Sequence, residues 1–319
     1  MTDYYNSPKE ECSLLMIPDM CMGWRLDQAL VTLFPEYSRS CLQRWVKSGN
    51  ILLAGRVVSV KRQVFGGELL TFDLPKEVEQ GLVIPECGDL TRVYEDDDVL
   101  VLNKPAGLVV HPGSGNWTGT LQNRLLYAYP ELAIVPRAGL VHRLDKDTNG
   151  LMVVAKNLVS HTHLVRQLQA RSVRRLYWAV VQGVMQGNKI VTAPIGRHAT
   201  QRTKMAVIEG GREAMTHVMV QEVLPHYTWV QCRLETGRTH QIRVHLRHLG
   251  FPLAGDSTYG RRPIREEDHQ LELQLGRQAL QAHELSFIHP RREQEVTFSI
   301  PMAEDMAGLV QALRNKVVG

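Results

Sequence analysis

The most informative stretch of the chain reads GLVHRLDKDTNGLMVVAK and spans residues 139–156. Its apolar second half, residues 151–155, predicts a buried strand, and the loop before it carries an arginine and two carboxylates. Asp145 lies between Arg143 and Lys146, so this cationic surround should keep its carboxylate ionised. An ionised carboxylate in a pocket can act as a nucleophile, a general base or a stabiliser of an oxocarbenium ion. The same residues also fit an ordinary Asp/Asn/Gly turn before a strand, and the stretch alone leaves both interpretations open.

The composition is that of an ordinary globular protein, with room for two domains in 319 residues. A net charge of +4 says little about partners, but its distribution is informative because residues 148–208 contain no Asp or Glu. Such an acid-free basic segment suits a polyanion, although a solvated surface is the alternative. Its basic residues are Lys156, Arg166, Arg171, Arg174, Arg175, Lys189, Arg197, Arg202 and Lys204.

Several classes of protein do not fit the sequence. The five cysteines are scattered without a Cys-x-x-Cys pair, which argues against a zinc ribbon or disulfide framework and favours the reducing cytoplasm. The polar N-terminus MTDYYNSPKEEC is no signal peptide, and no apolar run approaches the ~20 residues of a membrane span. The acidic run at residues 95–98 predicts a turn facing water rather than a metal site. We therefore expect neither a membrane partner nor a metal.

The first 75 residues predict a small α+β domain. Its second helix has Ser38 as a plausible N-cap, and Arg44 and Lys47 share one face of it, with Arg39 at its start. The predicted helices span residues 24–34 and 38–48, and the predicted strands span residues 13–17, 51–53, 57–60 and 69–74.

A polar segment at residues 76–88 predicts a linker, and residues 89–319 predict a larger domain of alternating strands and helices. In one predicted helix, beginning near residue 239, His240, Arg243 and Arg247 would lie on one ridge. The predicted strands include residues 99–102, 151–155, 175–181, 218–223, 228–234, 283–289 and 295–300, and further helices lie near 120–127, 158–168 and 305–316.

Three segments of the larger domain resemble motifs of the RluA family of RNA pseudouridine synthases. They are residues 139–156, NKPAGLVVHPG at residues 103–113 and LETGRTHQIRVHLRHLGFPLAGDSTYG at residues 234–260. The motifs are long and occur in the family's order. The family usually has Ser or Thr where this chain has Asn149, which is a departure beside the catalytic position.

The resemblance assigns roles to individual residues. It implies that Asp145 is catalytic, that Tyr177 lies against the target base and that Arg243 forms an ion pair with Asp145. It leaves Arg238 available to the backbone or the substrate. From spacing alone, a core tyrosine is the favoured interpretation of Tyr177.

Residues 13–75 resemble the small RNA-binding module named after ribosomal protein S four, with Ala54-Gly55 in place of its usual Asn-Gly turn. In that module the two helices present basic side chains to structured RNA. The expected fold is therefore α+β: residues 89–319 form a mixed, mainly antiparallel sheet with flanking helices (a pseudouridine synthase fold), preceded by the S-four-like domain at 13–75 and the linker at 76–88.

The implied function is isomerisation of specific uridines to pseudouridine in structured RNA, with large-subunit (23S) ribosomal RNA as the expected substrate. The target base must leave its stack, and the planar guanidinium of Arg143 could fill the gap. The candidate RNA-binding residues are Arg143, Arg238, His240, Arg39, Arg44 and Lys47. A cytoplasmic monomer without cofactor is expected, with a part in ribosome biogenesis.

Alternatives stay open at this point. The substrate could be tRNA, or the chain could be a non-catalytic RNA-binding factor for ribosome assembly. A glycoside hydrolase would use two carboxylates, and Asp145 with Asp147 is a nominal pair, although residues two apart on a loop rarely face each other. The sequence does not choose between a nucleophilic and a basic role for Asp145.

Overall fold

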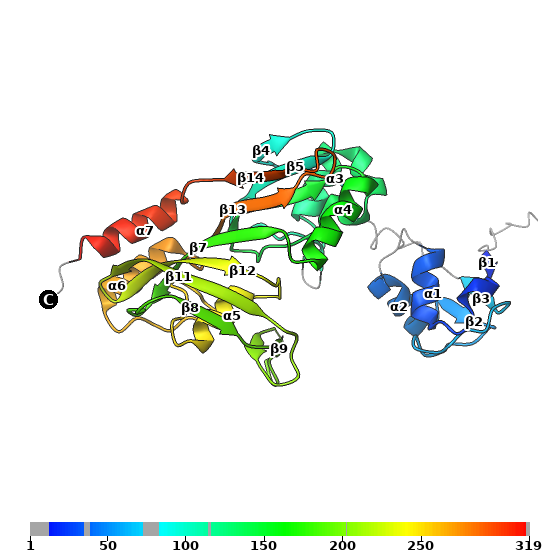
Figure 1. The fold of residues 1–319 in the computed structure, drawn as a ribbon. Helices are drawn as coiled ribbons and strands as arrows, with labels where there is room; N and C mark the ends of the chain where they lie inside the picture. The colour runs from blue at the N-terminus through cyan, green and yellow to red at the C-terminus, as the bar shows by residue number, and fades with distance from the viewer. Residues whose placement is uncertain (1–12, 35–38, 73–82, 114–115, 202, 317–319) are drawn as a thin grey trace, which may run out of the picture. The chain divides into compact units, whose positions relative to one another are not determined.

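The computed structural model describes residues 13–34, 39–72, 83–113, 116–201 and 203–316. The chain forms two compact units, Met1–Ile84 and Pro85–Gly319 (Figure 1). The boundary falls within residues 76–88, where a linker was expected, and residues 76–82 lie outside the described part of the chain. Each unit has a buried core of its own.

The smaller unit combines an antiparallel sheet with two helices. Its elements are β1 (Ser13–Met16), the 3-10 turn η1 (Asp19–Cys21), α1 (Leu26–Leu33), α2 (Arg39–Ser48), β2 (Ile51–Leu53) and β3 (Leu69–Phe72). Strand β3 lies between β1 and β2. Leu30, Leu42 and Trp45 of the helices are buried in one cluster with Leu70 of the sheet. The predicted helices and these three strands are confirmed, while the predicted cap Ser38 lies outside the described residues.

The strand predicted at residues 57–60 is wrong, because this segment has no strand structure. The first backbone N–H groups of a helix have no partner within the helix. In α1, Asp27 N donates to Val60 O over 3.1 Å and Leu26 N donates to Arg62 O over 2.7 Å. The segment therefore caps α1 instead of extending the sheet.

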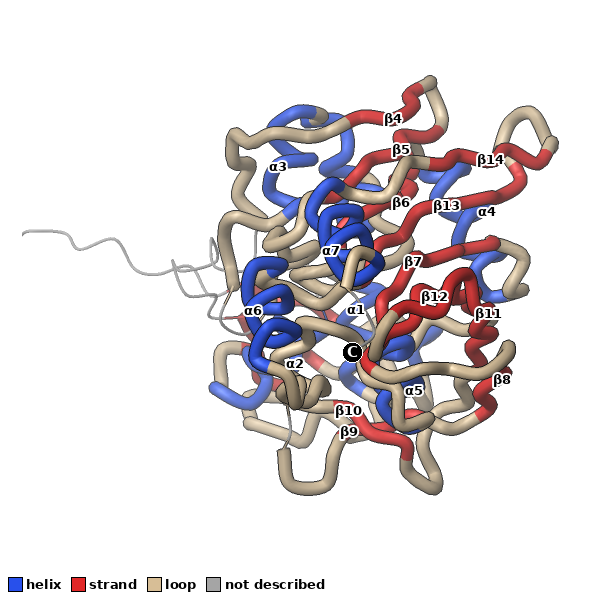
Figure 2. The backbone as a smooth tube through the Cα atoms, turned by 90° about the vertical axis from the view of Figure 1, so that its left-hand side faces the viewer, coloured by secondary structure: helices blue, strands red, loops and turns tan. Residues whose placement is uncertain are grey.

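A mixed sheet of nine strands forms the larger unit, in the order β4-β5-β6-β13-β7-β12-β11-β8, with β14 paired to β13 (Figure 2). Among the described residues, β6 and β13 are the one parallel pair. The predicted α+β class with a mainly antiparallel sheet is confirmed. The bounds are β4 Arg92–Glu95, β5 Val99–Lys104, β6 Asn149–Ala155, β7 Arg174–Gln182, β8 Lys189–Thr192, β11 Met215–Leu224, β12 Tyr227–Leu234, β13 Leu280–Ile288 and β14 Glu295–Ser299, and β9 (Ile195–Arg197) pairs separately with β10 (Met205–Val207).

Strand β6 carries the second half of the 139–156 stretch and is buried along its whole length. Two glycines allow close backbone contacts at the two ends of β6: Gly150 packs against β13, and Gly139 packs against the last residue of β6. A Cβ on Gly150 would lie 2.2 Å from Ala282 O, and one on Gly139 would lie 2.0 Å from Ala155 O. Both glycines also have positive φ, which side chains disfavour. The loop between them is therefore fixed at both ends.

In the described part of the larger unit, five α-helices flank the sheet (Figure 1). The N-termini of α3 and α4 are capped, because Thr120 Oγ1 accepts from Asn123 N and Asn157 Oδ1 accepts from Ser160 N over 2.8 Å. No helix in the described ranges is long and apolar enough to cross a bilayer. The helices are α3 Leu121–Ala128, α4 Leu158–Gln169, α5 Gln241–His248, α6 Glu266–Leu275 and α7 Glu304–Arg314, besides the 3-10 turns η3 Pro130–Ile134 and η4 Pro136–Gly139.

The acidic run at residues 95–98 faces water less than predicted. Asp98 is 6% exposed and accepts hydrogen bonds from Asn157 Nδ2 over 3.0 Å and Ser160 Oγ over 3.1 Å. Asp96 forms an ion pair with His289 over 2.8 Å. The prediction of a solvated turn is wrong for these two residues, because they join β4 and β5 to α4 and to the turn after β13.

Candidate active site

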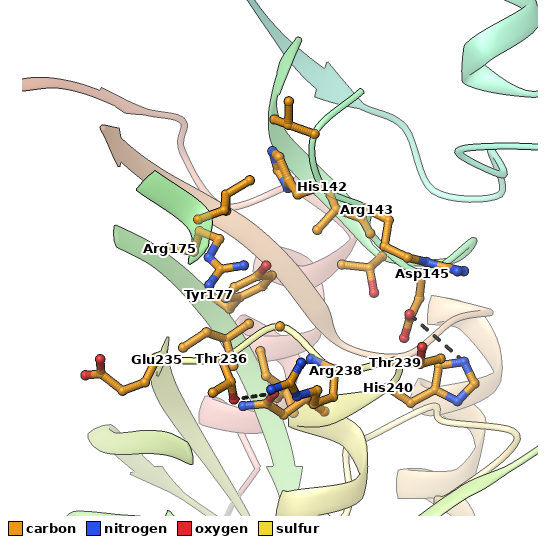
Figure 3. A pocket seen from close by; sticks show the side chains of 18 of the residues that line it. His142, Arg143, Asp145, Arg175, Tyr177, Glu235, Thr236, Arg238, Thr239 and His240 are labelled. Atoms are coloured by element: carbon orange, nitrogen blue, oxygen red, sulfur yellow. Dashed lines mark hydrogen bonds and ion pairs between the residues drawn. The ribbon is translucent and has the colours of Figure 1, made fainter. Parts of the chain in front are cut away.

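A pocket of about 520 Å³ opens in the larger unit among segments that are far apart in the sequence (Figure 3). Its walls come from the loop at residues 140–145, from β7 and from residues 234–243, which connect β12 to α5. Six of the nine candidate residues line this pocket. They are Asp145, Tyr177, Arg243, Arg143, Arg238 and His240.

A buried lysine holds the loop that carries Asp145. Lys104, at the end of β5, is 1% exposed, and its Nζ donates to the carbonyl oxygens of Pro105, Leu108 and Lys146 over 2.7, 2.9 and 2.9 Å. Burial lowers the pKa of Lys104 to about 7, against the opposing pull of Asp147 and Asp145. The NKP segment thereby fixes the carbonyl next to Asp145 in the sequence.

Lys104→Met is expected to lower the free energy of unfolding by about 2–4 kcal/mol, because three carbonyl groups lose their hydrogen-bond donor. The loss is partly offset, since the variant no longer buries an ammonium group. Turnover should fall as well, since the loop loses its anchor. Lys146→Met is the matched control, because that side chain is exposed in the same loop. Chemical denaturation of both variants measures the effect. Equal stability of the two would contradict the anchoring role.

Asp145 lines the pocket, and one of its oxygens is paired with Arg243. Arg243 Nη1 donates to Asp145 Oδ2 over 3.1 Å, and the two side chains are 7% and 15% exposed. The planar fork of Arg243 is used elsewhere, because its Nε and Nη2 donate to Asp256 Oδ2 and Oδ1 over 2.8 and 2.9 Å. The ion pair expected between Arg243 and Asp145 is present, and it is made through a single hydrogen bond.

Asp256 was not singled out from the sequence, although it lies in the third motif. Its side chain is fully buried, and its Oδ1 also accepts from the backbone N–H groups of Thr258 and Tyr259 over 2.9 and 3.0 Å. Burial raises the pKa of Asp256, but the bonds and charge of Arg243 lower it further, so the net shift is downward. Asp256 thus orients Arg243, which in turn contacts Asp145.

His240 lines the pocket near Asp145, away from Tyr177 of β7 (Figure 3). Its φ of 57° is left-handed, so α5 begins one residue later, and the predicted ridge of His240, Arg243 and Arg247 is wrong. Tyr259 OH accepts from Met205 N over 2.8 Å and is hydrogen-bonded to His240 Nδ1 over 2.7 Å. His240 Nε2 lies 4.0 Å from Asp145 Oδ1. Burial lowers the pKa of His240, which favours its neutral form.

Tyr177 closes the pocket from the sheet side. It is 5% exposed and belongs to the core while lining the cavity, so its core and pocket roles coexist. Burial raises the pKa of Tyr177, which keeps the phenol protonated. Arg143 is exposed on the loop two residues before Asp145. Arg238 donates from Nε to Glu213 O over 2.9 Å.

Comparison with known proteins gives one family throughout. The family model for RNA pseudouridylate synthase matches residues 98–248. A ribosomal large subunit pseudouridine synthase D of Nitrosomonas europaea is 47% identical, covering 94% of this chain and 88% of that protein. The chain belongs to the RNA pseudouridylate synthase family. The resemblance and enzyme class predicted from the sequence are thereby confirmed.

Further relatives of this RNA pseudouridylate synthase agree. The ribosomal large subunit pseudouridine synthase D of Pseudomonas aeruginosa is 48% identical, covering 93% of this chain and 94% of its own. Human RNA Pseudouridylate Synthase Domain Containing 1 is similar in structure, with a TM-score of 0.53, 28% identity and coverage of 72% of this chain and 98% of its own. Human RNA Pseudouridylate Synthase Domain Containing 4 shares the fold, with a TM-score of 0.55, 23% identity and coverage of 70% and 93%.

The remaining three candidates of the synthase lie in the smaller unit. Arg39 is engaged in structure, because its Nη2 contacts the buried carboxylate of Asp27 over 2.8 Å, and Arg25 contacts the same group over 2.9 Å. Burial alone would raise the pKa of Asp27, yet bonds from Arg39, Arg25 and Gln43 lower it to about 2. Arg44 and Lys47 are exposed on α2.

Motif matching overlooked part of the pocket of the synthase. Arg137 and Arg171 line it with left-handed backbones, at φ of 55° and 59°. His111 lines it as well, and burial together with Arg143 and Arg137 lowers its pKa to about 4. The acid-free composition of residues 148–208 was the available signal for Arg171. His111 lies in the motif at residues 103–113, which implied no role for it, and nothing local in the sequence marked Arg137.

Proposed function

We propose that the synthase converts uridines of large-subunit ribosomal RNA to pseudouridine in this pocket, with Asp145 as the catalytic residue. The observation that carries the proposal is the placement of Asp145: the side chain lines a pocket large enough for a nucleoside, and its Oδ2 is held by Arg243. The names of the relatives, ribosomal large subunit pseudouridine synthase D, support the choice of RNA. Ribosomal RNA is made in the cytoplasm of bacteria such as those relatives' sources, so we place the protein there.

The reaction breaks the N1–C1′ bond of uridine, turns the base and joins its C5 to C1′. It consumes no redox equivalent and no water, so an ionised carboxylate can suffice, and no cofactor is required. Asp145 Oδ1 would either bond to C1′ or remove the C2′ proton. Both routes use the carboxylate of Asp145, whose Oδ2 accepts a hydrogen bond from the Arg243 guanidinium.

Other pocket residues have supporting roles in the proposal. Tyr177 would lie against the face of the uracil, as its position in the wall allows. Arg143, exposed at the mouth of the loop, would occupy the gap left by the flipped base. Arg238 and His240, which line the same pocket, would contact the sugar–phosphate of the target nucleotide.

Release of tritium from RNA labelled at C5 of uridine tests this function, because C5 loses its hydrogen only when it bonds to C1′. Purified protein would be incubated with 23S rRNA transcripts, with tRNA transcripts and with large ribosomal subunits. We expect release from the 23S transcript or the subunit and little from tRNA. Release confined to tRNA would overturn the choice of substrate, and tight binding of rRNA without release would favour a binding-only assembly factor.

We propose that the smaller unit contributes RNA affinity through α2. Replacing both Arg44 and Lys47 by glutamine in the full-length chain should weaken rRNA binding and flatten the log–log salt dependence by up to about two units, one for each phosphate that the variant no longer neutralises. Catalysis at saturating RNA should not change, because both residues lie outside the unit that forms the pocket. Arg39 is left intact, since it stabilises Asp27.

The matched control for this variant replaces Arg56 and Lys61, two exposed residues of the same unit outside α2, and removes the same charge. Filter binding at salt concentrations from about 50 to about 300 mM measures the salt dependence of both double variants. Equal slopes for the two double variants would mean that α2 does not contact the RNA backbone.

A further inference from the structure

Arg175 is a buried arginine inside the pocket with no acidic partner. It is the second residue of β7, is 8% exposed and lies on the same face as Tyr177, two residues on. Its Nε has no hydrogen-bond partner among the described residues. A Cβ on Gly237 would lie 2.9 Å from Arg175 Nη1, so the guanidinium rests directly on the backbone where residue 237 has no side chain.

Burying a guanidinium without a partner costs free energy. Other buried arginines of this unit are paired with carboxylates. Arg243 contacts Asp256 and Asp145, and Arg277 contacts Asp305 over 2.6 Å.

The acidic side chains that line the pocket are already engaged with other cations. Asp145 is bonded to Arg243, and Glu235 forms an ion pair with Arg233 over 3.2 Å and contacts His217 over 3.1 Å. Within the described residues, Arg175 therefore keeps an uncompensated positive charge at the wall of the pocket, which is a preformed site for an anion.

The position of this charge indicates which anion it meets. Figure 3 shows Arg175 beside Tyr177, on the side of the pocket away from Asp145. The ribose must lie at Asp145, since C1′ or C2′ reacts there, and the base must lie along Tyr177. Because Arg175 lies beyond Tyr177 from Asp145, an anion bound to Arg175 is on the uracil side of the nucleotide. A backbone phosphate is the other source of negative charge, and variants of Arg175 can separate the two.

We infer that Arg175 binds the uracil anion that exists between bond breaking and bond making. This inference rests on the proposed function of the pocket. When the N1–C1′ bond breaks, its electron pair stays on the base and spreads over N1, O2 and O4. C1′ is then bonded to Asp145, or C2′ has given its proton to Asp145. In the first route C5 attacks C1′, the carboxylate leaves, C5 loses its proton and N1 gains one. In the second route C5 bonds to C1′ of the unsaturated sugar, C2′ regains its proton from Asp145, C5 loses its proton and N1 gains one.

Arg175→Met and Arg175→Lys in the full-length protein test the inference. Single-turnover loss of the target nucleoside is measured on rRNA containing uridine and on the same RNA containing 5-fluorouridine, whose base is the better leaving group. On uridine, Arg175→Met should slow bond cleavage by about 10²-fold, the effect of losing one donor to a developing anion, and Arg175→Lys should retain more. On 5-fluorouridine the defect should shrink at least tenfold, because a stable anion needs less help. RNA affinity and its salt dependence should stay unchanged.

Two results would overturn the inference. Weaker binding with a salt dependence about one unit shallower, and normal cleavage at saturating RNA, would assign Arg175 to a phosphate. Equal defects of Arg175→Met on both nucleosides would show no role at the leaving base. Thermal unfolding shows whether Arg175→Met is folded. If it is not, the same comparison is made with Arg175→Lys. Asp145→Asn is measured in parallel. Activity in that variant would contradict the proposed function of the pocket, whereas the Arg175 results bear only on the inference about the uracil anion.

Discussion

Asp145→Asn is expected to lower the single-turnover rate of pseudouridine formation by about 10⁴-fold or more, the scale seen when an essential catalytic group is removed. An amide can neither bond to C1′ nor accept the C2′ proton. Binding of rRNA should change by less than about tenfold, because asparagine has the same shape and Asp145 is one small, 15% exposed side chain of a large surface. Tritium release and filter binding measure the two quantities separately.

Asp147→Asn is the matched control for this variant, since it removes a carboxylate from the same loop. Asp147 does not line the pocket, so turnover should stay within about tenfold of wild type. A glycoside hydrolase mechanism would instead need both carboxylates. Comparable losses in the two variants would therefore revive that alternative, and tritium release by Asp145→Asn within tenfold of wild type would remove Asp145 from the chemistry.

Arg243→Lys is expected to lower turnover by about 10²-fold or more, because small errors in the position of a catalytic group are that costly. Lysine carries the same charge but has one nitrogen, whereas Arg243 contacts Asp256 with two nitrogens and Asp145 with the third. A lysine ammonium cannot make all three contacts from one position. Single-turnover kinetics at saturating RNA measure the loss.

Arg238→Lys provides the comparison, because the contact made by Arg238 is a single hydrogen bond to Glu213 O. This variant should keep most activity at low salt. Asp256→Asn should follow Arg243→Lys in direction, since it weakens the hold on the same guanidinium. Equal tolerance of lysine at positions 243 and 238 would contradict the distinction between them.

The sequence predicted elements with a strong pattern. The apolar run at residues 151–155 became the buried β6, and the alternation at residues 175–181 became β7. The fold class followed from the family resemblance, because a sheet order such as β6-β13-β7 joins strands over 100 residues apart and leaves no local trace. The strand predicted at residues 57–60 failed for a related reason, since its backbone partners are the first residues of α1.

Individual site residues were predicted where a motif contained them, but the contacts between these residues were not. Asp256 decides where the fork of Arg243 points, and this depends on α5 and the following loop packing together. The left-handed backbone of His240 shortened α5 and directed the imidazole toward Tyr259 instead of along the helix. Arg175 looked like one member of a basic segment, and its burial without an acid becomes visible only in three dimensions.

Mapping pseudouridines in ribosomal and transfer RNA tests the central claim most directly. RNA would be compared between cells that lack this protein and the same cells given back the wild-type chain or Asp145→Asn. We predict that specific positions of the large-subunit rRNA lose pseudouridine without the protein, regain it with the wild-type chain and stay uridine with Asp145→Asn. An unchanged rRNA map in cells lacking the protein, or full restoration by Asp145→Asn, would contradict the account.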